Sequence, residues 1–343
     1  MSDSKEKGVT PPQDVVEIRP VAHSPGDLIV EPEEGDRAEF SSQLERTLEE
    51  TERQARRIGA QASAPDRDRS WERAREIVAD FRPAPWFIWR LVNFVLGQSG
   101  QINSISEGLV FGLRRLIFAA ASDPVLGCGE KVNDVRQALK IVPADVIAAT
   151  ALIHAVCRRM HSRPFERIWR PVLDDALLRA RIGHRVGMYD PQFGPGRGML
   201  AGFAGRCGLA VLISSGELDQ ARQALEMLAT GAPINKVGLG VYQCEPLHVS
   251  ALLLSAGGCG RDAAFGTAGY SLRDYGVAAG ENLDQQKWLA AFVICEGVRL
   301  MKEDLVDEGS WTVLGFVNTL DREALFSETR KAVRQGHGWN WMA

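Results

Sequence analysis

The sequence lacks closely paired cysteines and long apolar runs. Its six cysteines are scattered at 128, 157, 207, 244, 259 and 295, without the spacing of a zinc site or a redox pair. Most lie in apolar, helix-like stretches, so we expect buried, reduced thiols and a cytoplasmic protein. Charge or glycine interrupts each apolar stretch before the roughly 18 residues that a membrane helix needs, so we expect no membrane partner.

An excess of positive charge is also missing. The net charge is −4 and the isoelectric point is near 6.0, which argues against nucleic acid as a partner. The first residues, Met1 to Lys7, are polar and precede no apolar segment, so we expect no secretory signal. Neither a Ser-His-Asp nor a Cys-His arrangement is visible, and the sequence predicts no catalytic residue, no metal and no cofactor.

Alternation of apolar and polar residues, the pattern of a half-buried strand, is nearly absent. The apolar residues instead recur at three- and four-residue spacing, which predicts an all-α protein of about ten short helices. These helices are expected near residues 86–95, 109–117, 132–142, 143–156, 165–186, 198–214, 217–229, 247–254 and 288–301.

Three regions follow from composition. Residues 1–38 are rich in proline and acidic residues and predict a disordered acidic tail. Residues 39–70 predict a charged, solvated helix from Phe40, capped by Ser41 or Ser42, and then a linker. Residues 71–336 form the predicted helical domain.

The stretch 198–214 is expected at the centre of the fold. Gly202, Gly205 and Gly208 place small residues three apart. Each glycine costs a helix roughly 1 kcal/mol relative to alanine. Their accumulation therefore predicts that another backbone packs closely against this helix.

The order of several motifs over residues 75–335 resembles the HDOD domain, the non-catalytic relative of the HD phosphohydrolase fold. The stretches that are similar to family motifs are 113–124, 132–139, 165–170, 200–209, and 245–248 followed by 251–254. The resemblance implies an HD-like multi-helix domain that acts in bacterial cytosolic signalling without catalysis.

The metal-binding positions of HD phosphohydrolases differ here. The adjacent His-Asp pair aligns with Gly205 and Arg206, and an earlier histidine aligns with Pro171. The late pair of histidines aligns with Gly269 and Tyr270. Glycine has no ligating side chain and arginine repels a cation, so the resemblance implies a protein that is not an enzyme.

Arginines accumulate in 158–185, and a guanidinium binds phosphate or carboxylate bidentately. Either this is a solvated face or it contacts a partner protein or a small anion, and the acidic tail is a further candidate to dock there. The predicted contact residues are Arg158, Arg159, Arg163, Arg167, Arg170, His248 and Tyr270.

Two other groups have simpler interpretations. His154, His161 and His184 have no carboxylate pair nearby, and His248 has no companion ligands, so structural roles are favoured over metal binding. The loop Gly194–Gly198 precedes a helix but lacks the lysine of a phosphate-binding loop, so a plain loop is favoured.

Together these observations predict a non-enzymatic regulatory module that binds a protein partner or a small anionic ligand. Two alternatives stay open. One is a metal-dependent HD-type phosphohydrolase acting on nucleotides with a rearranged site. The other is a structural oligomerisation protein that assembles through the helix at residues 40–60.

Overall fold

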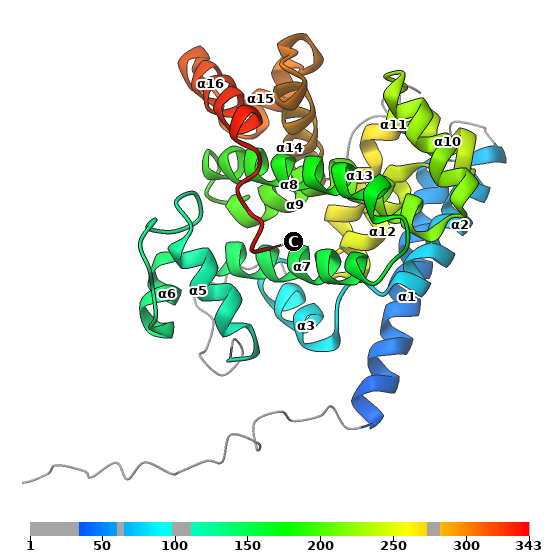
Figure 1. The fold of residues 1–343 in the computed structure, drawn as a ribbon, viewed down its shortest axis with the longest axis horizontal. Coiled ribbons are helices and arrows are strands. Elements are labelled where there is room, and N and C mark those ends of the chain that lie inside the picture. Colours follow the sequence, from blue (N-terminus) through cyan, green and yellow to red (C-terminus); the bar gives the residue numbers. More distant parts are fainter. Residues whose placement is uncertain (1–33, 60–64, 98–110, 273–281, 343) are drawn as a thin grey trace, which may run out of the picture.

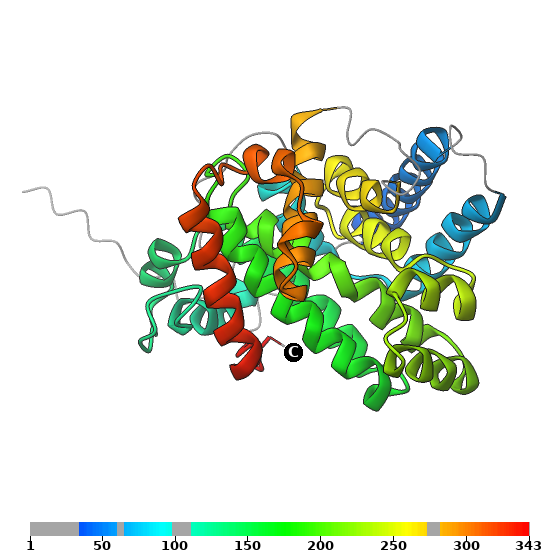
Figure 2. The same cartoon turned by 90° about the horizontal axis from the view of Figure 1, so that it is seen from above.

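The computed structural model describes residues 34–59, 65–97, 111–272 and 282–342. Within these ranges the chain forms fifteen α-helices and no β-strand (Figures 1 and 2), which confirms the all-α prediction. The HD-like topology stays a prediction. The proposed tail at 1–33 and most of the turn at 97–100 lie outside the described residues.

The helices follow one another with short connections. They are α1 (Glu34–Gly59), α2 (Pro65–Phe81), α3 (Trp86–Val95), α5 (Arg114–Ser122), α6 (Val135–Ile141), α7 (Ala144–His161), α8 (Glu166–Met188), α9 (Pro195–Ser215), α10 (Leu218–Ala229), α11 (Ile234–Val237), α12 (Pro246–Ala256), α13 (Arg261–Leu272), α14 (Leu283–Leu300), α15 (Glu308–Val313) and α16 (Thr319–Gln335). Short non-α turns are η1 (Phe111–Leu113), η2 (Gly238–Tyr242) and η4 (Glu303–Leu305).

Helix α9 is the core of the fold, as the sequence predicts. It packs against α7, α8, α12 and α14, and nearly all its side chains are buried. The helix starts at a proline, which suits a first helical position because its missing N–H has no helical acceptor there. Gly194 supplies the preceding residue in a left-handed backbone conformation, with φ +85°.

By length and composition alone, α9 is able to cross a membrane. Its 18-residue window has a mean hydropathy of 1.4, and 89% of that window is buried inside the fold. The argument from interrupted apolar runs is therefore wrong for this segment, because small glycines and one arginine do not lower its mean hydropathy enough. Its burial against four neighbouring helices is that of a core helix.

Glycines on both helices bring the α8 and α9 backbones together. A Cβ at Gly183 would lie 2.0 Å from the Gly198 carbonyl oxygen, and one at Gly202 would lie 2.1 Å from the Arg179 carbonyl oxygen. No side chain fits in that space, so the predicted close packing at Gly202 is confirmed. Gly183 and Gly198 complete the contact but were not singled out in the sequence.

The other two central glycines have different neighbours. A Cβ at Gly208 would lie 2.0 Å from the Pro246 carbonyl oxygen of α12, so a second backbone packs closely there. Gly205 instead faces the Arg179 side chain, whose Cδ would be 3.3 Å from an added Cβ. Its small size makes room for a buried guanidinium group.

The N-terminal helix differs from its prediction. It begins at Glu34, so residues 34–38 are helical, and Ser41 and Ser42 lie inside the helix instead of capping it. Leu48 is buried, and α1 packs on α2, α12 and α13. One face of α1 therefore packs on the protein's own chain, whereas most of its other described residues are exposed, as predicted for a solvated helix. Assembly through this helix stays a prediction. Helix α2 begins at Pro65, within the expected linker.

Side-chain caps explain where several helices begin. Asp134 accepts from the Gln137 amide at the start of α6, three residues later than the apolar spacing indicates. Asn282 caps α14 in the same way, five residues earlier than predicted. A capping box of Glu217 and Gln220 starts α10 where the sequence places it. Pro171 lies inside α8.

The close contact predicts the effect of adding one methyl group. We expect Gly202→Ala to lower the free energy of unfolding by about 3 kcal/mol, because backbone atoms of α8 must move. Gly205→Ala is the matched control on the same helix, where only a side chain must shift, and we expect it to cost under about 1 kcal/mol. Urea denaturation measures both; equal losses would contradict the backbone contact.

Candidate functional site

A cleft with a volume of about 1240 Å³ is lined by residues of α3, α5 and α7. Figure 1 shows where these three helices lie in the fold. Among the described residues, five arginines line the cleft, whereas no aspartate or glutamate does. The arginines are Arg82, Arg114, Arg115, Arg158 and Arg159. All five side chains are exposed. The cleft therefore presents concentrated positive charge in a chain whose net charge is −4.

Three separate parts of the chain supply these arginines. Arg158 and Arg159 end α7, where the negative end of the helix dipole favours a cation. Arg114 and Arg115 begin α5, where the positive end of the dipole disfavours one. Such a breach of a local rule is typical of a functional position.

Few of these guanidinium groups are neutralised internally. Arg82, Arg115 and Arg158 form no ion pair with any residue in the described part of the chain. Arg159 uses its Nε to donate to the Phe81 carbonyl oxygen at 2.8 Å, which leaves its terminal nitrogens directed elsewhere. The positive charge is thus available to a ligand.

Aromatic residues complete the walls. Phe87 of α3 is 45% exposed although it is large and apolar. Phe40 of α1 and Trp341 near the C-terminus also line the cleft. The Trp341 indole is held by its Nε1, which donates to Asp123 Oδ2 at 3.2 Å. Arginines beside exposed apolar rings suit a ligand that carries both negative charge and apolar groups.

The cleft includes only part of the predicted arginine cluster. Arg158 and Arg159 line it, whereas Arg163, which pairs with Asp80 at 2.8 Å, does not. Arg170 lies between two carboxylates of its own helix, at 3.1 Å from Asp174 and 3.8 Å from Glu166. Arg167 is exposed and does not line the cleft. The expected partner contact of Arg163, Arg167 and Arg170 stays a prediction.

Sequence reasoning missed Arg82, Arg114 and Arg115. They join Arg158 only through the packing of α3 and α5 on α7. A signal was present, since Arg114-Arg115 opens a helix without an acidic residue in its first turn.

His248 is buried, so its expected role in surface contact is wrong for this structure. Its Nδ1 lies 2.8 Å from Ser70 Oγ, and its Nε2 lies 3.4 Å from Glu245 Oε2. The Trp71 ring stacks on the imidazole with centroids 3.9 Å apart. Tyr270 is half-buried against Phe292 and lies apart from the cleft lining.

This Ser70, His248 and Glu245 group has the composition of a catalytic triad, which the sequence did not reveal because Ser70 is 178 residues from His248. The serine side chain is buried at 0% exposure, and its Oγ accepts from the Glu245 amide at 2.8 Å. A buried hydroxyl that is already engaged in this way does not reach a substrate. The group instead fastens α2 to the start of α12.

Arg206 belongs to a buried ion network between α8, α9 and α14. Its Nη2 lies 3.1 Å from Glu296 Oε1, and its Nε lies 3.3 Å from Asp175 Oδ2. Arg179 pairs with the same two carboxylates, and Arg299 Nε lies 2.6 Å from Asp175 Oδ1. Three guanidinium groups therefore share two carboxylates, close to Gly205.

The network shifts the ionisation of its members. Burial raises the pKa of Asp175, but the charges of Arg179, Arg206 and Arg299 outweigh burial and hold the pKa below its ordinary value. Burial and the neighbouring Arg179 charge lower the pKa of Arg206. The Arg206 guanidinium is therefore a cation that the fold holds between the carboxylates of Asp175 and Glu296.

The histidines do not converge. His154 Nδ1 lies 2.9 Å from the Met342 carbonyl oxygen, and His161 Nδ1 lies 2.8 Å from that of Cys157. His184 is buried in α8 with no partner for its Nδ1. In the described ranges, His, Cys, Asp and Glu side chains form no group of three able to hold a metal ion.

The first turn of α9 contains residues 195–198, so the prediction of a plain loop at Gly194–Gly198 is wrong except at Gly194, which precedes the helix. Asp145 Oδ2 accepts from the Gly196 amide at 2.7 Å, so a carboxylate of the protein itself occupies the start of the helix. Burial raises the pKa of Asp145.

The cysteines are free, and five of the six are buried. Burial raises the pKa of Cys157 and Cys207 to about 12, so these thiols stay protonated at neutral pH and are poor nucleophiles. The expectation of buried thiols is confirmed for every cysteine except Cys128, which is exposed.

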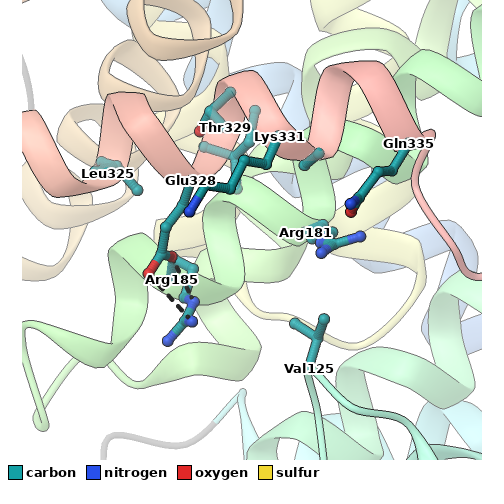
Figure 3. Close-up of a pocket in the computed structure, with 10 residues that line it drawn as sticks. Val125, Arg181, Arg185, Leu325, Glu328, Thr329, Lys331 and Gln335 are labelled. Atoms are coloured by element: carbon teal, nitrogen blue, oxygen red, sulfur yellow. Dashed lines mark hydrogen bonds and ion pairs between the residues drawn. The ribbon is translucent and has the colours of Figure 1, made fainter.

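A smaller pocket of about 220 Å³ lies between α8 and α16 (Figure 3). Arg185 crosses its mouth toward Glu328, with the Nε and Oε2 atoms 3.0 Å apart. Because charges of both signs line this pocket, it selects an anion less strongly than the cleft. The cleft between α3, α5 and α7 is therefore the better candidate site.

Comparison with protein-family models, curated proteins and solved structures finds no match for this chain.

His184 predicts a pH dependence of stability. Burial, and then the Arg185 charge, lower its pKa from 6.5 to about 4. Below pH 6.5, His184 therefore becomes protonated in the unfolded chain but stays neutral in the folded protein until the pH approaches 4. Stability from this residue is complete above pH 6.5 and falls as the pH drops towards 4, by about 2 to 3 kcal/mol between pH 7.5 and 4.5.

Urea denaturation at these two pH values tests the prediction. His184→Gln is expected to lose less stability on acidification than the wild type, by that amount, because glutamine does not titrate. His161→Gln, which removes an exposed histidine from α7, is the control. The same loss in His184→Gln and the wild type would show that His184 does not carry the effect.

Proposed function

We propose that this chain is a non-enzymatic regulatory module of the HDOD type, whose arginine-lined cleft binds an acidic segment of a partner protein. The observation that carries the proposal is the lining itself, in which the residues that the structure describes include five exposed arginines and neither aspartate nor glutamate. Surface arginines elsewhere, such as Arg163 and Arg185, have carboxylate partners.

The size of the cleft favours a protein segment over a small anion. Small-molecule pockets usually hold about 300–1,000 Å³ and enclose their ligand. This cleft measures about 1240 Å³, which exceeds that range. An extended peptide fills such a space and brings several carboxylates to separate arginines.

Charge and apolar contact contribute differently. Exposed ion pairs are worth up to about 1 kcal/mol each and weaken with salt. They speed association and select acidic partners. Burial of the exposed Phe87 ring against an apolar side chain adds the hydrophobic part of the binding free energy. We therefore propose an acidic segment with interspersed apolar residues as the ligand.

Arg206 supports the non-enzymatic part of the proposal. Where the HD phosphohydrolases carry a metal-binding His-Asp pair, this guanidinium pairs with Asp175 and Glu296. A cation supplied by the protein neutralises the carboxylates that face this position. The position thus has a structural use that involves no reaction.

A charge-reversal experiment tests the cleft. The probe is a fluorescein-labelled eight-residue peptide of alternating glutamate and leucine, and fluorescence anisotropy measures its binding. We expect Arg115→Glu with Arg158→Glu to weaken binding at least about tenfold, because two attractions become repulsions. We also expect wild-type binding to weaken as sodium chloride rises from 50 to 500 mM.

Arg167→Glu with Arg222→Glu is the matched control. It makes the same change of net charge at exposed arginines outside the cleft and should keep wild-type binding within about twofold, since the sites are screened from the cleft. Equal loss in both double variants would mean that only net charge matters, and the cleft would not be the binding site.

A further inference from the structure

The acidic charge of this chain is concentrated before the first helix. Residues 1–33 hold seven acidic residues, three lysines or arginines, and therefore a net charge of −4. The whole chain also has a net charge of −4, so residues 34–343 are balanced. One segment supplies the entire excess of negative charge, while the described lining of the cleft contains five arginines and no acidic residue.

The last part of this segment has the chemistry that the cleft requires. Residues 27–33 read Asp-Leu-Ile-Val-Glu-Pro-Glu. Three carboxylates flank three consecutive apolar side chains, and no lysine or arginine is present. This composition matches the ligand that arginines beside exposed aromatic rings favour.

The segment is also attached next to the cleft. Helix α1 begins at Glu34, and Phe40, six residues later, lines the cleft. The Phe40 ring packs edge-on against Trp89 of α3, with centroids 5.5 Å apart, so the second turn of α1 contacts α3. Six helical residues span about 9 Å, and seven extended residues span up to about 23 Å, which is enough to cross the cleft.

Tethering makes a weak contact effective. A short tether gives an effective concentration in the millimolar range, so a segment with only millimolar affinity occupies the cleft for a large part of the time. An external ligand binds only to those molecules whose cleft is empty. Its apparent affinity is therefore the intrinsic affinity multiplied by the fraction of molecules with an empty cleft.

We infer that residues 27–33 dock in the arginine-lined cleft of their own chain and compete there with the acidic partner segment. This inference rests on the proposed function of the cleft. The inference adds a ligand from the same chain, which inhibits binding of the partner segment to the cleft. A partner gains access by outcompeting the internal segment, and any change that removes its negative charge opens the cleft.

The full-length chain and the fluorescent glutamate-leucine peptide test the competition. Asp27→Asn, Glu31→Gln and Glu33→Gln together remove three carboxylates from the internal segment, and we expect the peptide to bind about three- to tenfold more tightly. The control neutralises three acids farther from α1, as Asp3→Asn, Glu6→Gln and Asp14→Asn, and should keep wild-type affinity. Equal affinities in the two triple variants would overturn the inference.

A second measurement locates the segment directly. A photo-crosslinking amino acid at position 29 of the full-length chain is expected to label residues 82–87, 112–119 or 154–162 of the same chain, as mass spectrometry reports. Labels elsewhere, or labels that join two chains, would overturn an intramolecular occupant of the cleft.

The two proposals fail in different ways. If Arg115→Glu with Arg158→Glu leaves peptide binding unchanged, the cleft does not bind the peptide and the proposed function is wrong. Residues 27–33 then have no binding site in the cleft for which to compete. If that variant weakens binding but neutralising residues 27–33 changes nothing, the cleft binds acidic segments and only autoinhibition is wrong.

Discussion

The close contact between the α8 and α9 backbones sets the geometry of the structure around it. Glycine at 183, 198 and 202 allows carbonyl oxygens of one helix to lie where side chains of the other would stand. At this separation, Asp175 and Arg179 on α8 lie within reach of Arg206 on α9. Helices α7, α12 and α14 then pack around the pair. Interiors packed to this density transmit small displacements, so the contact governs the position of α7, and through it of Arg158.

The protein treats its arginines in two opposite ways. In the core, Arg179, Arg206 and Arg299 surround two carboxylates, and the pairing compensates much of the desolvation of each charge. In the cleft, five arginines are exposed, and no aspartate or glutamate of the described ranges lines it. The first arrangement joins three helices into one unit. In the second, Arg82, Arg115 and Arg158 form no ion pair within the described part of the chain.

Local patterns predicted local features well. The spacing of apolar residues located most helices, and Gly202 and Gly208 indicated close packing. Features that depend on side chains distant in sequence escaped prediction. Ser70 meets His248 across 178 residues, and Arg82, Arg114 and Arg158 come from three separate parts of the chain. The run of arginines in 158–185 indicated only part of the cleft for a related reason, because sequence proximity does not show which side chains line the same cavity: Arg158 and Arg159 do, and Arg163 does not. The HDOD resemblance rests on motif order and stays a prediction.

The wall of the cleft that contains Trp341 has a consequence for the newly made chain. Arg159 is the last α7 residue that lines the cleft, and Ser162, the first residue after the helix, lines it too. Trp341 is synthesised 179 residues after Ser162. At roughly 5–20 residues per second, this is a delay of roughly 10 to 40 s. The arginines of the cleft are therefore synthesised well before the tryptophan that completes its wall.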